Sequence, residues 1–155
     1  MWSDEILKVI LQDCASATTL TGIYSVDTLP KQVEYPAALI VNLSPSTSPG
    51  THWTAIYINK HGRGQYFDSF GNEPSKPIVF FLKRNCKIYH VNRTQIHHEE
   101  SILCGLFCIV FIYFTVRGKN IFSSFYTRNL KKNDTIVKSL VKKLSKEKKN
   151  VNKKI

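Results

Sequence analysis

The stretch ESILCGLFCIVFIYF, residues 100–114, decides the fold of this chain. It belongs to an almost continuous apolar run over residues 102–116, interrupted only by Cys, Gly, Tyr and Thr. The run is too short to span a bilayer comfortably, so it predicts a buried helix over residues 104–117 that ends at Gly118. The cysteine at its start, Cys104, can be a core residue, a disulfide half, a metal ligand or a nucleophile.

The segments before this helix predict strands. AALIVNL, residues 37–43, is apolar enough for a buried strand. HWTAIYIN, residues 52–59, is rich in aromatic and β-branched residues, which favour a strand. KHGRG then turns the chain, and QYFDSFG, residues 65–71, continues as the next strand and its exit. These two segments predict a β-hairpin.

Weaker signals complete the fold class, which we predict to be α+β. The helical candidates are a first helix with Ile6, Leu7, Ile10 and Leu11 on one face, a helix that begins near Ile78, and an amphipathic helix through residues 136–144. The strand candidates are residues 23–26 and 87–91. Together they predict a central mixed or antiparallel sheet flanked by helices.

Composition limits the class of protein. The chain has 155 residues, of which 43% are hydrophobic and 12% aromatic, enough for one folded domain. No basic-then-apolar segment opens the sequence, so we expect no secretory signal and no membrane association. Four cysteines without such a signal predict free thiols in a reducing, intracellular compartment. This leaves core packing, metal binding or catalysis for Cys104.

Positive charge is concentrated at one end of the chain. The formal net charge is +11, and ten lysines against two acidic residues after residue 130 account for +8 of it. This asymmetry predicts a single domain over residues 1–130 and a basic C-terminal helix with a Lys-rich tail over residues 131–155. Such tails bind polyanions, most often nucleic acid, or serve only to keep a protein in solution. The sequence is compatible with both.

Cys104 stands where chemistry is favoured. Unpaired N–H groups and the macrodipole at a helix N-terminus lower a thiol pKa. Gly105 would leave room for a substrate backbone to approach. A cysteine beside glycine before an apolar helix is also typical of a structural core residue, so a nucleophile requires a base nearby.

A base and its orienting acid are available in the predicted hairpin. His52 precedes the first strand after a flexible loop, and Asp68 lies in the second strand between aromatic and polar neighbours. In a hairpin the start of one strand lies opposite the end of its partner, so the two side chains can be neighbours. A buried acid requires such a partner. The alternative is a surface histidine and an aspartate that caps the turn before Gly71.

These residues also carry a family resemblance. GTHWTAIYINKHGRGQYFDSFG, residues 50–71, followed by SILCGLFCIVFIYF, residues 101–114, resembles the adenovirus endopeptidase (adenain) family of cysteine proteases. The family is related more distantly to the SUMO-specific proteases. The shared pattern is His-Trp on a strand, an acid in the next strand, and Cys-Gly-x-Phe-Cys at the start of the central helix. The resemblance extends upstream and covers about residues 3–118.

The resemblance implies a role for each residue. His52 would be the general base, Asp68 its orienter and Cys104 the nucleophile. The family also uses a Gln side chain as an oxyanion donor, commonly seven residues before the cysteine. Here His97 occupies that position and Gln95 lies nine residues upstream. We predict Gln95 as the donor, with His97 as the alternative, and the Cys104 backbone N–H as the second donor.

The other cysteines have weaker assignments. Cys86 lies at the separation from Cys104 at which the adenovirus enzyme has a cysteine that links to an activating peptide, but it can equally be an ordinary thiol. Cys108, one helical turn after Cys104, is expected to pack in the core. A zinc site could be drawn from His97, His98, Cys104 and Cys108, but the spacing of these residues is not that of a zinc site. We therefore predict no metal and no chemically required cofactor, with an activating peptide and DNA as the candidate effectors.

The sequence thus predicts a thiol endopeptidase of a virus or virus-like element. By the resemblance, it would act as a monomer on capsid or core precursors, cleave after small residues at Gly-Gly-type or Gly-x-type sites, and be stimulated by DNA. It would be found in the virion and in the host nucleus or cytoplasm. Two alternatives stay open: a protease that removes ubiquitin-like proteins, and a basic nucleic-acid-binding protein without catalysis.

Overall fold

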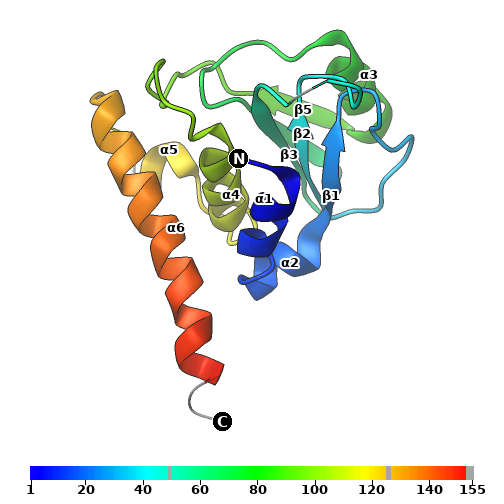
Figure 1. The fold of residues 1–155 in the computed structure, drawn as a ribbon. Coiled ribbons are helices and arrows are strands. Elements are labelled where there is room, and N and C mark those ends of the chain that lie inside the picture. Colours follow the sequence, from blue (N-terminus) through cyan, green and yellow to red (C-terminus); the bar gives the residue numbers. More distant parts are fainter. Residues whose placement is uncertain (49, 125–126, 153–155) are drawn as a thin grey trace.

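The computed structural model describes residues 1–48, 50–124 and 127–152. Its strands form one five-stranded sheet in the order β1-β2-β3-β4-β5 (Figure 1). The strands are β1 (Leu20–Ser25), β2 (Ala37–Asn42), β3 (Trp53–Ile58), β4 (Arg63–Phe67) and β5 (Ile88–Val91). The central pairings β2–β3 and β3–β4 are antiparallel, whereas β1–β2 and β4–β5 are parallel. The predicted mixed sheet of an α+β protein is confirmed.

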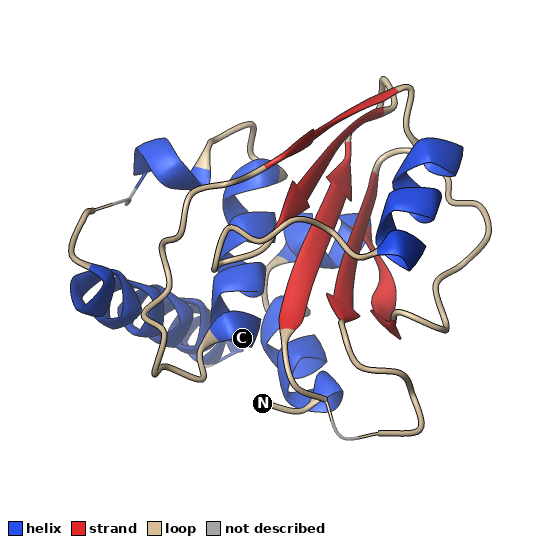
Figure 2. Cartoon of the chain, turned by 90° about the horizontal axis from the view of Figure 1, so that it is seen from above, coloured by secondary structure: helices blue, strands red, loops and turns tan. Residues whose placement is uncertain are grey.

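Helices cover both faces of this sheet (Figure 2). They are α1 (Ser3–Ile10), α2 (Cys14–Thr19), α3 (Lys76–Asn85), α4 (Cys104–Thr115), α5 (Ile121–Ser124) and α6 (Leu130–Asn152). Helix α3 covers one face, α4 packs on the other, and α1 and α6 pack against α4. The sequence did not predict α2, whose cap is nevertheless readable: the Asp13 carboxylate accepts the backbone N–H of Ser16 at 3.1 Å.

The central strand β2 shows how the two layers are built. All six of its residues are buried. Ala38 and Ile40 belong to the core under α4, whereas Ala37, Leu39 and Val41 belong to the core under α3. Successive side chains of a strand point to opposite faces, so a strand between two helical layers must be apolar throughout. This explains why AALIVN has no polar alternation.

Helix α4 is the buried helix that the sequence predicted. It is apolar on all sides and packs against β3, α1 and α6. The helix ends at Thr115, two residues before the predicted end, and turns follow to Gly118. Gly118 has φ 70°, and its N–H donates to the Thr115 carbonyl at 3.0 Å. The left-handed conformation that glycine adopts easily therefore closes the helix.

Helix α6 begins earlier than its predicted apolar stripe. It starts at Leu130 rather than near residue 136, and Val137 and Val141 are buried in the core under α4. Asn133 is also buried and donates to the carbonyl oxygens of Ile96 and Thr127. The first half of the basic segment is thus packed on the body of the protein. Its exposed lysines lie on the outer side of a docked helix.

Candidate active site

The hairpin and the central helix bring His52, Asp68 and Cys104 together. His52 immediately precedes β3, Asp68 immediately follows β4, and Cys104 is the first residue of α4. The His52 Nε2 atom lies 2.9 Å from the Asp68 Oδ1 atom. The Cys104 thiol lies close enough to the His52 imidazole for each group to shift the pKa of the other. The predicted proximity of histidine and aspartate across the hairpin is therefore observed, and the cysteine joins them from a distant part of the sequence.

The nearly buried Cys104 thiol is surrounded by N–H donors. Its Sγ atom accepts the backbone N–H of Trp53 at 3.5 Å. Burial alone would raise the pKa of the thiol, but the His52 hydrogen bond and charge and the N–H groups of Trp53 and Gly105 lower it. The position at a helix N-terminus acts in the same direction. These features favour a thiolate.

His52 carries the complementary charge. Its side chain is 14% exposed and stacks on Phe70 with ring centroids 4.9 Å apart. Burial alone would lower its pKa, but the hydrogen bonds and negative charges of Asp68 and Cys104 raise that pKa to about 9. His52 is therefore protonated at neutral pH. The pair is disposed as a thiolate and an imidazolium.

Asp68 is fixed more firmly than a surface carboxylate. It is fully buried, and its Oδ1 atom also accepts the backbone N–H of Phe70 at 2.8 Å. Asn92 holds the Asp68 backbone, accepting its N–H at 2.9 Å and donating to its carbonyl at 3.0 Å. The Oδ2 atom is buried and has no hydrogen-bond partner among the described residues. A carboxylate held in this way orients the imidazole and stabilises its positive charge.

Sequence reasoning missed the role of Asn92. It follows β5, which runs parallel to β4, so the two strands end side by side beneath Asp68. The sequence did contain a local indication of this role, namely a polar residue directly after a short predicted strand. The parallel pairing that gives it meaning involves two segments separated by α3, and no local pattern predicts that pairing.

Gly105 does not serve the purpose that the sequence suggested. A Cβ atom on this residue would come within 3.0 Å of the Met1 Sδ atom and 3.2 Å of the Ile6 Cδ1 atom. The absent side chain therefore makes room for α1 and the residues before it, not for a substrate backbone. The same N-terminal segment contacts the site elsewhere, because the Met1 carbonyl accepts the Trp53 indole N–H at 3.0 Å.

The two candidate oxyanion donors have different surroundings. His97 is fully buried, and its ring nitrogens lie 2.9 Å from the hydroxyls of Ser69 and Ser101. Both ring nitrogens therefore have partners within the protein and the ring is inaccessible, which argues against His97 as the donor. Gln95 donates one amide N–H to the His97 carbonyl at 3.0 Å, which leaves its second N–H for other use. Its role as a donor stays a prediction.

Cys86 and Cys108 lie in unreactive surroundings. Cys108 is completely buried, and burial raises its thiol pKa. Cys86 is half-buried, with its Sγ atom close to Gly64, and burial raises its thiol pKa to about 11. Its predicted link to a peptide is untested. Among the described residues, no cluster of three or more His, Cys, Asp or Glu side chains is placed to hold a metal ion.

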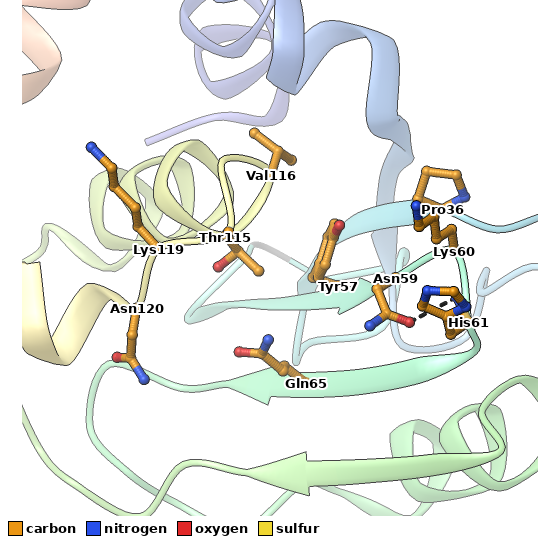
Figure 3. A pocket seen from close by; sticks show the side chains of 11 residues that line it. Pro36, Tyr57, Asn59, Lys60, His61, Gln65, Thr115, Val116, Lys119 and Asn120 are labelled. Carbon is orange, nitrogen blue, oxygen red and sulfur yellow. Dashed lines mark hydrogen bonds between the residues drawn. The ribbon is translucent and has the colours of Figure 1, made fainter.

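Cavities lie at both ends of β3. Beside the candidate site, a cavity of about 370 Å³ is bordered by residues 1–3, by the edge strand β1, by the loop after β2 and by Trp53. A cavity of about 450 Å³ lies at the opposite ends of β3 and α4, where Tyr57, Asn59 and Thr115 line it (Figure 3). The cavity of about 450 Å³ is thus separate from His52 and Cys104. Within the part of the chain that the structure describes, no helix is long and apolar enough to cross a membrane.

Several proteins with similar sequences are viral cysteine proteases. Over 85 residues it is 33% identical to the cysteine protease S273R of African swine fever virus (isolate Tick/Malawi/Lil 20-1/1983), a match that covers 47% of this chain and 31% of the relative. The protein from isolate Warthog/Namibia/Wart80/1980, named SUMO-1 cysteine protease S273R, is 32% identical over the same length and coverage. A mimivirus protein (Acanthamoeba polyphaga), R355, whose name describes a thiol protease, is 31% identical over 93 residues, covering 53% of this chain and 30% of its own length.

Solved structures agree with this result at the level of the fold. The crystal structure of the African swine fever virus pS273R protease matches with a TM-score of 0.58 at 16% identity, over 76% of this chain and 59% of that chain. Its selenomethionine form gives a TM-score of 0.54 over 77% and 60%. No family model matches the chain. The sequence matches span only about a third of the relatives' length. The predicted resemblance to viral cysteine proteases is confirmed.

Proposed function

We propose that this chain, which is related to the viral cysteine proteases, is a cysteine endopeptidase with Cys104 as nucleophile. The observation that carries the proposal is the juxtaposition of three groups at the start of a buried helix: His52 is hydrogen-bonded to Asp68 and interacts electrostatically with Cys104. A nucleophile, a base and an orienting group in contact are the elements of acyl transfer. The lowered thiol pKa and the raised imidazole pKa support the same role.

In the first half of the reaction, the Cys104 thiolate attacks the carbonyl carbon of the scissile peptide bond and a C–S bond forms. The carbonyl oxygen becomes an oxyanion next to the N-terminal N–H groups of α4, which have no partner within the helix. His52 gives its proton to the leaving amine, and the C–N bond breaks. The product is a thioester on Cys104 and a free amine.

In the second half, His52 takes a proton from water as the water oxygen attacks the thioester carbon. The C–S bond breaks, the carboxylic product leaves, and the thiolate and the imidazolium are restored. Asp68 is not protonated in either half of the reaction. Its role is to hold the Nε2 side of the ring, which leaves the other nitrogen for the thiol. The cycle needs no metal and no redox partner.

As substrates we propose capsid or core precursor proteins cut after small residues within infected cells or virions. The S273R relatives favour a second candidate, because some are named SUMO-1 cysteine proteases. Removal of a ubiquitin-like protein uses the same acyl-transfer chemistry. A panel that compares Gly-Gly-containing precursor peptides with SUMO and ubiquitin fusions separates the two candidates by the ratio of their kcat/KM values.

DNA is the proposed effector, through the basic side of α6. Six lysines are exposed in the part of this helix up to residue 146, for which side-chain burial is described: Lys131, Lys132, Lys138, Lys142, Lys143 and Lys146. Removal of residues 145–155 takes away four net positive charges. It should flatten the dependence of DNA binding on salt concentration, since fewer counterions are released, and should leave peptide cleavage without DNA unchanged. An unchanged salt slope would place any DNA contact on the rest of the chain.

One experiment tests the enzyme proposal directly. Alkylation with a low concentration of iodoacetamide at pH 6–7, followed by peptide mass mapping, should modify Cys104 faster than the exposed Cys14. The same treatment should abolish peptide hydrolysis in proportion to the modified fraction. Preferential modification of Cys14, or hydrolysis that survives complete modification of Cys104, would refute the proposal.

A further inference from the structure

His97 lies next to the candidate site but takes no part in the chemistry proposed above. It belongs to the segment between β5 and α4, and its backbone N–H donates to the Ser69 carbonyl at 3.1 Å. The side chain is fully buried. A buried histidine needs partners for two ring nitrogens and an apolar contact for its faces. His97 has both, and they belong to the two segments that carry the catalytic groups.

The two hydrogen bonds of the ring connect these segments. Nδ1 lies 2.9 Å from the hydroxyl of Ser69, the residue after Asp68. Nε2 lies 2.9 Å from the hydroxyl of Ser101, three residues before Cys104. The Ser101 Oγ atom also accepts the backbone N–H of Leu103 at 3.3 Å, so it shapes the turn into α4. The imidazole thus bridges the exit of β4 and the approach to the nucleophile.

The faces of the ring extend this bridge to His52. His97 stacks on Phe70 with centroids 4.4 Å apart and planes 4° apart, and it contacts Phe107 of α4 at 4.8 Å. Phe70 in turn stacks on His52. Stacked rings at these separations restrict each other's tilt. Moving His97 would therefore move the ring that supports the general base.

Histidine suits this position because it combines an aromatic face with two polar atoms on opposite sides. Phenylalanine would keep the stacking and lose both hydrogen bonds, and glutamine would keep polar atoms and lose the stacking. The ring must also stay neutral. Burial lowers the pKa of His97 to about 4, with the charge of His52 acting in the same direction and the carboxylates of Asp134 and Asp68 opposing it.

We propose that His97 is a positioning residue for the cysteine protease site: it joins the Ser69–Phe70 segment to the Ser101–Cys104 turn and so sets the His52 imidazole against the Cys104 thiol. This inference rests on the proposed function. It assigns His97 to the alignment of the catalytic pair, in place of the oxyanion role that its sequence position suggested.

The test compares four proteins: the wild type, His97→Phe, Ser101→Ala and the control His61→Phe. His61 is an exposed histidine in the β3–β4 turn, at the end of β3 away from the site. Each protein is assayed for kcat and KM on a cleavable peptide, with rates divided by the active fraction from covalent titration. The second readout is the rate of Cys104 alkylation between pH 5 and 9, which needs no substrate.

We expect His97→Phe to lower kcat per active site about 10- to 100-fold with little change in KM, because the pair is misaligned while the binding surface remains. The pH at which the Cys104 thiol becomes reactive should rise, since its contact with the imidazolium weakens. Ser101→Ala should shift both readouts in the same direction by less. His61→Phe should match the wild type in both.

The inference fails if a folded His97→Phe protein retains the wild-type kcat and thiol profile, or if it loses activity only in proportion to its unfolded fraction. If His97→Phe does not fold, an unchanged thiol profile in Ser101→Ala refutes the inference. Failure of the proposed function would give a different result from failure of this inference. If the wild-type Cys104 is no more reactive than Cys14 near neutral pH, the protease assignment itself fails, and there is no catalytic pair to position.

Discussion

His52 and His97 are the same residue type, stack on the same Phe70 ring and differ in charge. Burial lowers the pKa of both. His52 faces the Asp68 carboxylate and the Cys104 thiol, which raise its pKa to about 9, whereas His97 lies between two hydroxyls and its pKa falls to about 4. The partners, not the burial, therefore decide which histidine is charged.

This contrast explains the division of labour at the site. A proton donor for the leaving amine must be charged at neutral pH, and His52 is. A residue that connects two segments inside the protein should be neutral, since a second buried charge would repel the first. The predictions below change one partner at a time, beginning with the largest expected effect.

Removing the charged pair should abolish turnover. Cys104→Ala and His52→Ala are each expected to reduce kcat/KM by at least about 10⁴-fold, because nucleophile and base act as a unit. Peptide cleavage followed by chromatography measures the loss, and circular dichroism checks the fold. Cys14→Ala is the matched control, because Cys14 is exposed and has no role in the site. Full activity in Cys104→Ala would contradict the protease assignment.

Removing the carboxylate should make the two histidines more alike. Asp68→Asn keeps an acceptor for the imidazole but loses the charge that raises the His52 pKa, so that pKa should fall from about 9 toward its ordinary value. We expect kcat/KM to fall about 10²-fold, less than in His52→Ala. The His52 pKa can be followed by NMR titration of the ring protons. A pKa that stays near 9 would mean that the thiolate alone holds the proton.

The sequence predicted the His52 half of this contrast well. The order of histidine, acid and cysteine is a feature of the family resemblance, whereas the hairpin and the central helix depend on short-range rules: alternation along a strand, a tight turn, and an apolar run that begins at a cysteine. These rules place His52 and Asp68 at adjoining ends of two adjacent strands whatever the rest of the chain does. The buried central helix follows from composition alone, since a helix apolar on all sides must be covered.

The His97 half could not be predicted, because it depends on packing between distant segments. The spacing that the family resemblance implies made His97 the alternative to Gln95 as oxyanion donor, but the environment of His97 is made by Ser69, Phe70 and Phe107 from other parts of the chain. The N-terminal segment against Gly105 was missed for the same reason. A local pattern identifies residue types that can do chemistry, whereas tertiary contacts decide which of them do.

The charge of His52 also predicts the alkaline limit of activity. The leaving amine needs the imidazolium proton, so kcat/KM should decline as pH rises through about 9, the pKa of His52. In Asp68→Asn the decline should move to lower pH. Initial rates between pH 5 and 10 measure the profile, and rates after return to pH 7 exclude irreversible unfolding. A profile that keeps rising above pH 10 would contradict a role for His52 as an acid.

The smallest expected effects are on stability, and they have opposite signs for the two histidines. The pKa of His52 is raised in the folded state, so its contribution to the free energy of unfolding is complete below pH 6.5 and is lost as pH rises through about 9. The pKa of His97 is lowered, so the unfolded chain binds the proton more tightly. Its contribution is lost as pH falls from 6.5 through about 4.

His97→Phe isolates the second effect. At pH 7 the variant should be less stable by about 1–3 kcal/mol, because the hydroxyls of Ser69 and Ser101 lose their buried partner. Between pH 6.5 and 4 its free energy of unfolding should fall less steeply than that of the wild type, since phenylalanine has no proton to gain on unfolding. Titrating carboxylates affect both proteins equally and cancel in the difference. Urea unfolding at a series of pH values measures the difference in the free energy of unfolding between the two proteins. If the free energies of the two proteins run parallel with pH, His97 binds a proton as readily in the folded protein as in the unfolded chain.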